Sequence, residues 1–267
     1  MPEAVGSGIH ANDKLTMPTL SVIIITKNEA ANIRACLESV AWAEEIIVVD
    51  SGSTDATVSI AREFTPHVYE HDWPGFGAQK NRALSYTKGD WVFSIDADER
   101  VTPELKENII EALNSTSMLP NTFLVSRLSN FCGQFMHHSG WYPDLLPRLF
   151  RRGTARFSDD IVHERLLVEG VTEKLQGTLL HYSFNDFEQV LNKINHYSSA
   201  GAVKLYEKGK STSLFAAVFR GLWSFFRTYL LRGGFLDGQK GFILAVSNAE
   251  GTYYRYLKLL LKQEKEN

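Results

Sequence analysis

The feature that most constrains the fold is an alternation of short apolar runs with helix-like segments over the first hundred residues. Residues 20–26 and 45–50 are almost entirely β-branched and aliphatic, and residues 89–96 form a similar run that also ends in an acid. Such runs are typical of strands buried on both faces of a parallel sheet. Strands that alternate with helices predict right-handed crossovers, so we expect an α/β fold built on a mainly parallel sheet.

Length and composition exclude several other classes. The 267 residues are 44% hydrophobic and 22% charged, enough for a large core, which argues against disorder or a disulfide-stapled scaffold. Cys36 and Cys132 are too few for a thiolate metal site and predict a reducing, cytosolic setting. No apolar run is long enough to span a membrane. Residues 1–18 are expected to be a flexible extension rather than a leader.

The pattern changes along the chain. Asn28 is expected to cap the helix after the first strand, and Ser53 or Thr54 to start the next one. After a helix predicted over 103–114, four strand-like segments predict a mixed extension, at 122–128, 145–151, 161–168 and 175–182. Helices follow at 187–207, 214–231 and 242–262. We therefore expect the main domain to cover residues 19–183 and a helical region to cover 184–267.

Polar residues stand where the predicted parallel strands end, at Thr26, Asp50 and Asp96. Ligands of open α/β sheets bind at the carboxyl ends of strands. Asp96 and Asp98 are two residues apart on an extended turn, and such paired carboxylates suit Mg²⁺ or Mn²⁺ holding a diphosphate. The alternative is a solvated turn before the next helix, which Thr102 could cap.

A second candidate motif is Val49–Asp55, a strand that runs into a tight turn containing glycine. Its amides and hydroxyls suit a nucleoside, and Asp50 can accept a hydrogen bond from a ribose or base. The alternative is an ordinary loop with an Asx turn. The chain has neither a dinucleotide-binding glycine motif after its first strand nor a P-loop, so both of those interpretations lose support.

Three segments, Ser21–Glu29, Val48–Asp55 and Ile95–Glu99, resemble the inverting, nucleotide-sugar-dependent glycosyltransferases of family two, which have the GT-A fold. The similarity extends through Gly75–Arg82, Val162–Glu164 and Gly233–Gly241 to the bacterial lipopolysaccharide core glucosyltransferases, which add glucose to an inner-core heptose. It covers roughly residues 20–260. The first three segments are specific for the superfamily, and the last indicates the subgroup.

The resemblance implies roles for the matching residues. Those that would contact the nucleotide sugar are Thr26, Asn28, Glu29, Asp50, Lys80, Asn81 and Asp96. Asp50 would contact the uracil or ribose, and Lys80 and Asn81 would lie near the nucleotide or its phosphates. Asp98, with Asp96 beside it, would bind the metal.

The family's usual Glu-Asp pair and its Gln-x-x-Arg-Trp motif are absent in that form, and Asp159-Asp160 and His163-Glu164 stand in their place. An acceptor hydroxyl must lose its proton as it attacks the anomeric carbon. Glu164 is the first candidate for this base and Asp160 the second, with His163 as an orienting residue or a neighbour of the metal. The alternative is that His163 and Glu164 pair with Arg148 or Arg156.

Two further features concern histidines outside these motifs. His181 ends a predicted strand and could approach the diphosphate and metal, although a structural histidine is the alternative. His137 and His138 are adjacent, so they cannot jointly face one ion on a regular strand, and a polar loop is expected there.

The net charge of −3 conceals an asymmetry. Residues 200–267 hold 11 basic against 5 acidic side chains and twelve of the 31 aromatic residues. Residues 214–232 place Arg220 and Arg227 among bulky apolar side chains, as in a helix that lies in the interface of an anionic membrane. The alternative is packing against the rest of the protein or a second subunit. The acidic total and the lack of a binding motif argue against nucleic acid.

We therefore predict an inverting, metal-dependent glycosyltransferase that moves glucose from UDP-glucose to a lipid-linked glycan, the inner-core heptose of lipopolysaccharide. It would act as a peripheral protein at the cytoplasmic face of the membrane. One alternative is a sugar nucleotidyltransferase, which usually needs a basic, glycine-rich signature where this chain has Thr26–Glu29. The other is a non-catalytic membrane-surface protein on a degenerate fold of the same type. The sequence does not fix the oligomeric state.

Overall fold

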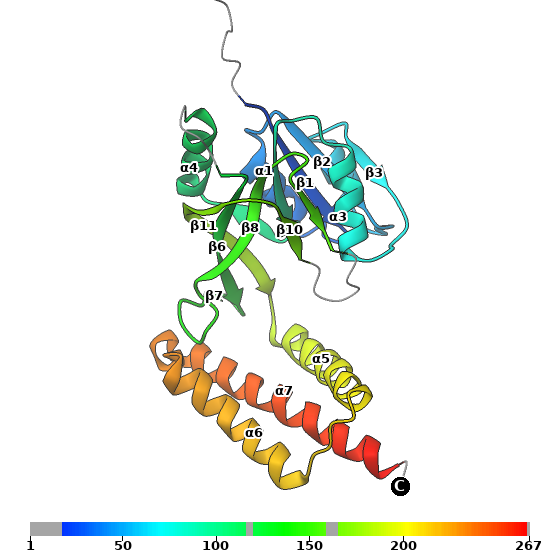
Figure 1. Cartoon of the computed structure of the whole chain (residues 1–267), viewed down its shortest axis with the longest axis vertical. Coiled ribbons are helices and arrows are strands. Elements are labelled where there is room, and N and C mark those ends of the chain that lie inside the picture. Colours follow the sequence, from blue (N-terminus) through cyan, green and yellow to red (C-terminus); the bar gives the residue numbers. More distant parts are fainter. Residues whose placement is uncertain (1–17, 116–119, 159–164, 266–267) are drawn as a thin grey trace, which may run out of the picture.

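The computed structural model describes residues 18–115, 120–158 and 165–265. In these residues, one large mixed sheet with flanking helices lies above a layer of three long C-terminal helices (Figure 1). The start of the predicted extension, residues 1–17, lies outside the described part of the chain.

The first half of the large sheet is parallel, with strand order β3-β2-β1-β4. Its strands are β1 (Leu20–Thr26), β2 (Glu45–Asp50), β3 (Val68–Glu70) and β4 (Trp91–Asp96). Thr26 pairs with Asp50 and Ile25 with Asp96, so the polar ends of three strands lie side by side. The predicted parallel sheet is confirmed.

Helices cover both faces of this half because the strand residues are apolar on both sides. They are α1 (Ile33–Val40), α2 (Thr57–Arg62) and α3 (Phe76–Ser85). Alternate residues of β1 face opposite ways, as the strand period requires. Val22 and Ile24 pack in one core with Leu37 of α1. Ile23 packs in a second core with Ala83 of α3.

Beyond β4 the sheet becomes mixed, as predicted. The order continues β4-β8-β6-β11-β5, with β7 paired to β6. These strands are β5 (Glu99–Val101), β6 (Thr122–Phe131), β7 (Gln134–Phe135), β8 (Asp144–Arg151) and β11 (Thr172–Phe184). The helix α4 (Pro103–Asn114) starts where predicted, and the Thr102 hydroxyl accepts a hydrogen bond from the Leu105 amide. A small separate sheet joins β9 (Ala155–Phe157) to β10 (Leu166–Val168).

Two predicted helix starts are wrong. The helix α1 begins only at Ile33, and Asn28 has a positive φ of 55° and accepts a hydrogen bond from the Thr54 amide instead. The helix α2 begins at Thr57, because the Ser53 hydroxyl is bonded to Asp50. Asn28 bonds to a residue of the loop after β2, and Ser53 bonds to a residue of its own loop. Neither side chain therefore caps the first turn of the helix that follows.

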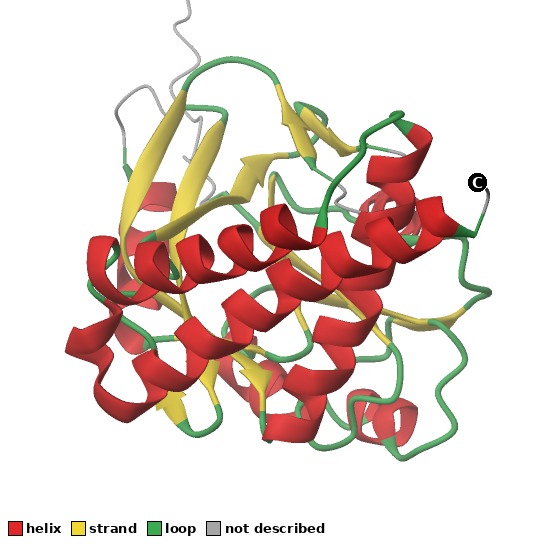
Figure 2. Cartoon of the chain, turned by 90° about the horizontal axis from the view of Figure 1, so that it is seen from below, coloured by secondary structure: helices red, strands yellow, loops and turns green. Residues whose placement is uncertain are grey.

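The C-terminal helices follow the predicted segments closely. They are α5 (Phe187–Glu207), α6 (Leu214–Phe226), which continues into a π-helical turn η1 (Arg227–Leu231), and α7 (Gly238–Glu264), which follows a 3₁₀ turn η2 (Gly234–Asp237). Seen from below, the three helices lie side by side beneath the sheet (Figure 2). In the described residues, no helix is long and apolar enough to cross a membrane.

A buried carboxylate ties the helical layer to the sheet. Asp237 accepts hydrogen bonds from the amides of His137 and His138 (3.2 and 3.1 Å), the His138 ring (3.0 Å) and the Ser139 hydroxyl (2.9 Å). The backbone beside Asp237 is packed so closely that a Cβ at Gly241 would lie 1.8 Å from the Gly234 carbonyl oxygen. Only glycine therefore fits at position 241. The polar loop expected at the paired histidines therefore serves as an anchor for the helices.

Candidate active site

A cleft of about 470 Å³ opens at the carboxyl ends of β1 and β4, where the sequence places its acidic motifs. We call it the strand-end cleft. Its lining contains the predicted site residues Thr26, Glu29, Asp96 and Asp98. It also contains four residues to which the sequence analysis assigned no role: Trp73, Phe76, Lys193 and Tyr197. Phe76 lies in the Gly75–Arg82 segment, whereas Trp73, Lys193 and Tyr197 belong to none of the segments that carry the resemblance, and only the fold brings them to the strand ends.

Asp96 is held between two cations. Its Oδ1 lies 3.0 Å from Lys80 Nζ and its Oδ2 lies 2.9 Å from Arg148 Nη2. Burial alone would raise the pKa of Asp96, but Lys80 and Arg148 outweigh it and hold that pKa well below its usual range. Because both carboxylate oxygens already bond to cations, Asp96 is less suited than Asp98 to binding a metal.

Glu99 completes this charge network and was not singled out from the sequence. Its side chain is fully buried, with Oε1 2.5 Å from Arg148 Nη2 and 3.4 Å from Arg127 Nη1. Its other oxygen accepts a hydrogen bond from the Asp96 amide at 2.9 Å. The network therefore fixes the backbone at the end of β4. An acid immediately after the Asp-x-Asp motif was the available signal.

Asp98 lies against His181. Nε2 of His181 is 3.2 Å from Asp98 Oδ2, and Nδ1 is 3.0 Å from the Ser129 hydroxyl. The Asp98 side chain is 27% exposed, so it remains reachable from the cleft. A second hydrogen bond at the far ring nitrogen is the usual way in which a protein orients a metal-binding histidine.

One carboxylate and one imidazole are donors that suit Mn²⁺ or Mg²⁺ when substrate phosphates complete the coordination. Within the described ranges, no cluster of three or more His, Cys, Asp or Glu residues could hold a metal by itself. The donor set of Asp98 and His181 therefore fits a divalent ion that binds together with a diphosphate.

Thr26 and Glu29 present polar groups to the strand-end cleft. The buried hydroxyl of Thr26 has no hydrogen-bond partner, which is costly unless a ligand supplies one. Burial raises the pKa of Glu29, and the nearby charge of Asp98 raises it further. Both residues lie where the sequence analysis expects a nucleotide.

Three other predicted contacts have side chains that are already bonded to the protein. The Asn28 side-chain oxygen accepts from the Thr54 amide at 2.8 Å, and Asp50 accepts from Ser53 and Gly52 within its own loop. Asn81 exchanges two hydrogen bonds with the backbone of Phe157, at 2.9 and 2.8 Å. Their predicted contacts with the nucleotide stay predictions.

The candidate bases Asp160, His163 and Glu164 lie outside the described residues. The residues on either side of that segment line a second cleft of about 520 Å³ with Lys80, Asp96 and Arg148. Phe157 precedes the segment and Arg165 follows it. Asp96 lines both clefts, so the two spaces are neighbours at the end of β4.

Comparison with known proteins identifies the family. Residues 21–174 match the family described as "Glycosyl transferase family 2". An uncharacterized glycosyltransferase of Rickettsia felis is 32% identical over 91% of this chain and 90% of its own length. The lipopolysaccharide core biosynthesis glycosyltransferase LpsC of Rhizobium meliloti is 33% identical over 89% of each chain.

Among solved structures, a glucosyl-3-phosphoglycerate synthase from Mycobacterium tuberculosis, crystallised with Mg²⁺ and UDP, is 28% identical. The match covers 42% of this chain and 44% of that one, with a TM-score of 0.35. The α/β fold is of the GT-A type, and the parallel half of its sheet carries the acidic strand ends. The family match and the two relatives, which align over about nine-tenths of their length, agree with this fold. The chain belongs to glycosyl transferase family 2.

Proposed function

We propose that this glycosyltransferase is metal-dependent and inverting, and that it transfers glucose from UDP-glucose to the inner-core heptose of lipopolysaccharide. The observation that carries the proposal is the pairing of Asp98 with His181 beside Asp96 in the lining of the strand-end cleft. The similarity to a lipopolysaccharide core glycosyltransferase over most of both chains supports the acceptor class.

The chain's own residues supply the steps of a single displacement. Thr26 and Glu29 line the space proposed for the nucleotide. Asp98 and His181 would hold Mg²⁺ or Mn²⁺, which neutralises the charge of a departing diphosphate. Glu164 would accept the proton of the acceptor hydroxyl while that oxygen bonds to the anomeric carbon and the bond to the diphosphate breaks. Asp160 is the second candidate for the base.

A donor screen tests this proposal. Release of a nucleoside diphosphate is measured for a panel of nucleotide sugars, with and without a truncated lipopolysaccharide acceptor, in wild type and Asp98→Ala. We expect acceptor-dependent release of UDP from UDP-glucose, abolished in Asp98→Ala. Full activity of that variant would contradict the metal site. Release of pyrophosphate from UTP and a sugar phosphate would instead identify a nucleotidyltransferase. No Mn²⁺-dependent binding of a nucleotide sugar by calorimetry would indicate a non-catalytic protein.

We further propose that the protein docks on the cytoplasmic face of an anionic membrane through α6 and the turns after it. Bulky apolar side chains are exposed there, including Phe215 (81% exposed), Phe219, Leu222 and Trp223. Arg220 lies on the same helix, with its guanidinium over the ring of Tyr256. Aromatic side chains beside arginine suit the interface of an anionic bilayer.

A further inference from the structure

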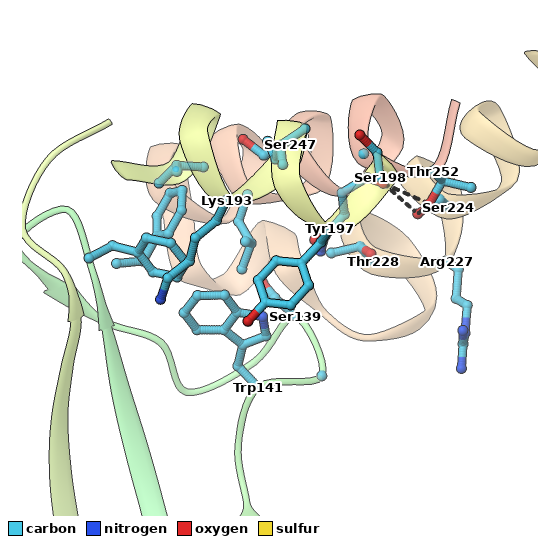
Figure 3. Close-up of a pocket in the computed structure, with 18 of the residues that line it drawn as sticks. Ser139, Trp141, Lys193, Tyr197, Ser198, Ser224, Arg227, Thr228, Ser247 and Thr252 are labelled. Carbon is cyan, nitrogen blue, oxygen red and sulfur yellow. Dashed lines mark hydrogen bonds between the residues drawn. The ribbon is translucent and has the colours of Figure 1, made fainter. Parts of the chain in front are cut away.

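A third large space lies among the C-terminal helices. This helical cavity, of about 450 Å³ and partly open to solvent, is lined mainly by α5, the end of α6 with η1, α7 and the loop at 139–141 (Figure 3). Its lining contains four cationic side chains, Lys193, Arg227, Arg232 and Arg255, and no aspartate or glutamate. A cavity lined by charge of one sign attracts the opposite charge and concentrates it.

The four cations are available to a ligand. None of them forms an ion pair within the part of the chain that the structure describes, and all four are exposed. Lys193 Nζ lies 4.3 Å from the centroid of the Phe184 ring. Arg232 lies directly over Gly140, where a Cβ would be 2.5 Å from its Cδ. A side chain at Gly140 would therefore displace this arginine.

A buried hydroxyl in the cavity wall also lacks a partner. Ser247 on α7 is 3% exposed, and its Oγ has no hydrogen bond in the structure. In contrast, the nearby hydroxyls of Thr252 and Ser224 bond to each other at 3.2 Å. Leaving a buried hydroxyl unpaired is unfavourable, and an anion accepts hydrogen bonds from hydroxyls as well as from arginines. The cavity therefore offers donors for an oxyanion.

The helical cavity shares wall residues with the spaces on either side. Lys193 and Tyr197 line both this cavity and the strand-end cleft. Arg227 and Arg255 line both the cavity and a groove beside Phe215 on the exposed face of α6. In Figure 3, Tyr197 and Trp141 lie near the middle of the view with Lys193 to their left, and Arg227 lies at the right. The helical cavity therefore adjoins both the strand-end cleft and the groove on α6.

We propose that the helical cavity binds an anionic group, a phosphate or a carboxylate, of the lipid-linked acceptor glycan. The anionic group would lie between the accepting hydroxyl, held near Lys193 and Tyr197, and the lipid part, held at α6. The inference rests on the proposed function, since it assumes a glycan acceptor. It adds that the acceptor must be acidic, which the strand-end cleft does not specify.

Binding measurements on the full chain test this inference. The probes are a deacylated acidic lipopolysaccharide core fragment, the same fragment after removal of its phosphates, a neutral oligosaccharide and inorganic phosphate. The cavity variant is Arg227→Gln/Arg255→Gln, and the matched control is Lys204→Gln/Lys208→Gln, which removes two exposed charges at the far end of α5. Mn²⁺ with UDP serves as the probe for the strand-end cleft.

We expect the cavity variant to bind the acidic fragment at least about tenfold more weakly, with the control unchanged. Both variants should bind Mn²⁺ and UDP like wild type. Retained binding after phosphate removal assigns the site to a carboxylate, and lost binding assigns it to a phosphate. Ser247→Ala, which changes no charge, should cause a smaller loss, and this variant keeps the test usable if the double variant does not fold.

Three results would overturn the inference. They are equal binding of the neutral oligosaccharide, equal weakening by the control variant, and binding of inorganic phosphate without binding of the acidic fragment. Failure of the proposed function gives a different result. In that case the acidic fragment binds through the helical cavity, but no sugar is transferred and Mn²⁺ with UDP does not bind.

Discussion

His181 Nε2 lies 3.2 Å from Asp98 Oδ2, although the two residues come from distant parts of the chain. The pairing of β11 with β5 brings them together, because His181 stands opposite Glu99 in that ladder. The strand that leads into the helical layer therefore also supplies a residue to the end of β4.

His181→Ala should raise the Mn²⁺ concentration needed for half-maximal sugar transfer by at least about tenfold, because one of two proposed protein ligands is lost. Ser129→Ala removes only the hydrogen bond to the far ring nitrogen and should have a smaller effect in the same direction. The measurement is a metal titration of UDP release. An unchanged titration in His181→Ala would assign the histidine to structure alone.

Glu164→Gln should lower kcat by about 10²–10⁴-fold, the usual contribution of a positioned general base. Binding of Mn²⁺ and UDP should be unchanged, because the change keeps the size of the side chain. Asp160→Asn is the matched variant. If Asp160→Asn shows the large loss of kcat and Glu164→Gln does not, the two assignments are exchanged.

Arg148→Met should lower the free energy of unfolding by about 3–5 kcal/mol, because it leaves the fully buried Glu99 without its nearest cation. Arg62→Met is the control, since Arg62 and its partner Glu70 are both exposed and such surface pairs contribute at most about 1 kcal/mol. Urea unfolding of both variants gives the comparison. Equal losses would show that the network at the end of β4 is not a major source of stability.

Asp90 gives a prediction about pH. Its carboxylate accepts hydrogen bonds from the amide and hydroxyl of Thr19, which hold the pKa of Asp90 below its usual range. The stabilisation is therefore fully present above about pH 4, the ordinary pKa of the group, and is lost as pH falls through the lowered value.

Asp90→Asn should cost at most about 1 kcal/mol at pH 7, since the site is exposed. The difference from wild type should shrink as pH falls below 4. Urea unfolding at neutral and acid pH measures the difference in the free energy of unfolding between the two proteins. A difference that grows in acid would contradict the expected direction of the pKa shift of Asp90.

The double variant Phe215→Ser/Phe219→Ser should reduce the fraction of protein that sediments with vesicles containing anionic lipid, because the two substitutions remove exposed aromatic rings from α6. Val171→Ser changes an apolar side chain that is 69% exposed on the sheet side of the molecule and is the control. Both proteins should retain binding to UDP. Unchanged sedimentation of the double variant would place the membrane contact elsewhere or show that there is none.

Much of the fold was predictable, because the strands of the parallel half and the long helices have local signals. The apolar runs that became β1, β2 and β4 carry their burial in their own composition, and Thr102 marks the start of α4. The helix starts near Asn28 and Ser53 were wrong because the two loops bond to each other. A cap predicted from neighbouring residues cannot include a partner that the fold brings from another loop.

The site was predictable only where it follows a strand end. Asp96 and Asp98 stand in a motif, whereas Arg148 and Lys193 reach the same region from β8 and α5 without any pattern around them. Cations of this kind become recognisable only when sheet order is known. The bonds that Asn81 makes to Phe157 likewise depend on β9, a strand that was not predicted from the sequence.

The anchoring of the helical layer by Asp237 has a consequence for exchange between relatives. One carboxylate collects its four hydrogen bonds from a loop about a hundred residues earlier in the chain. The C-terminal helices and the loop at 137–139 therefore depend on each other structurally, although they are far apart in the sequence. A chimaera that takes the helices from another family member should also take that loop from the same protein. Otherwise the buried carboxylate at the position of Asp237 could lose its hydrogen-bond donors, which is destabilising.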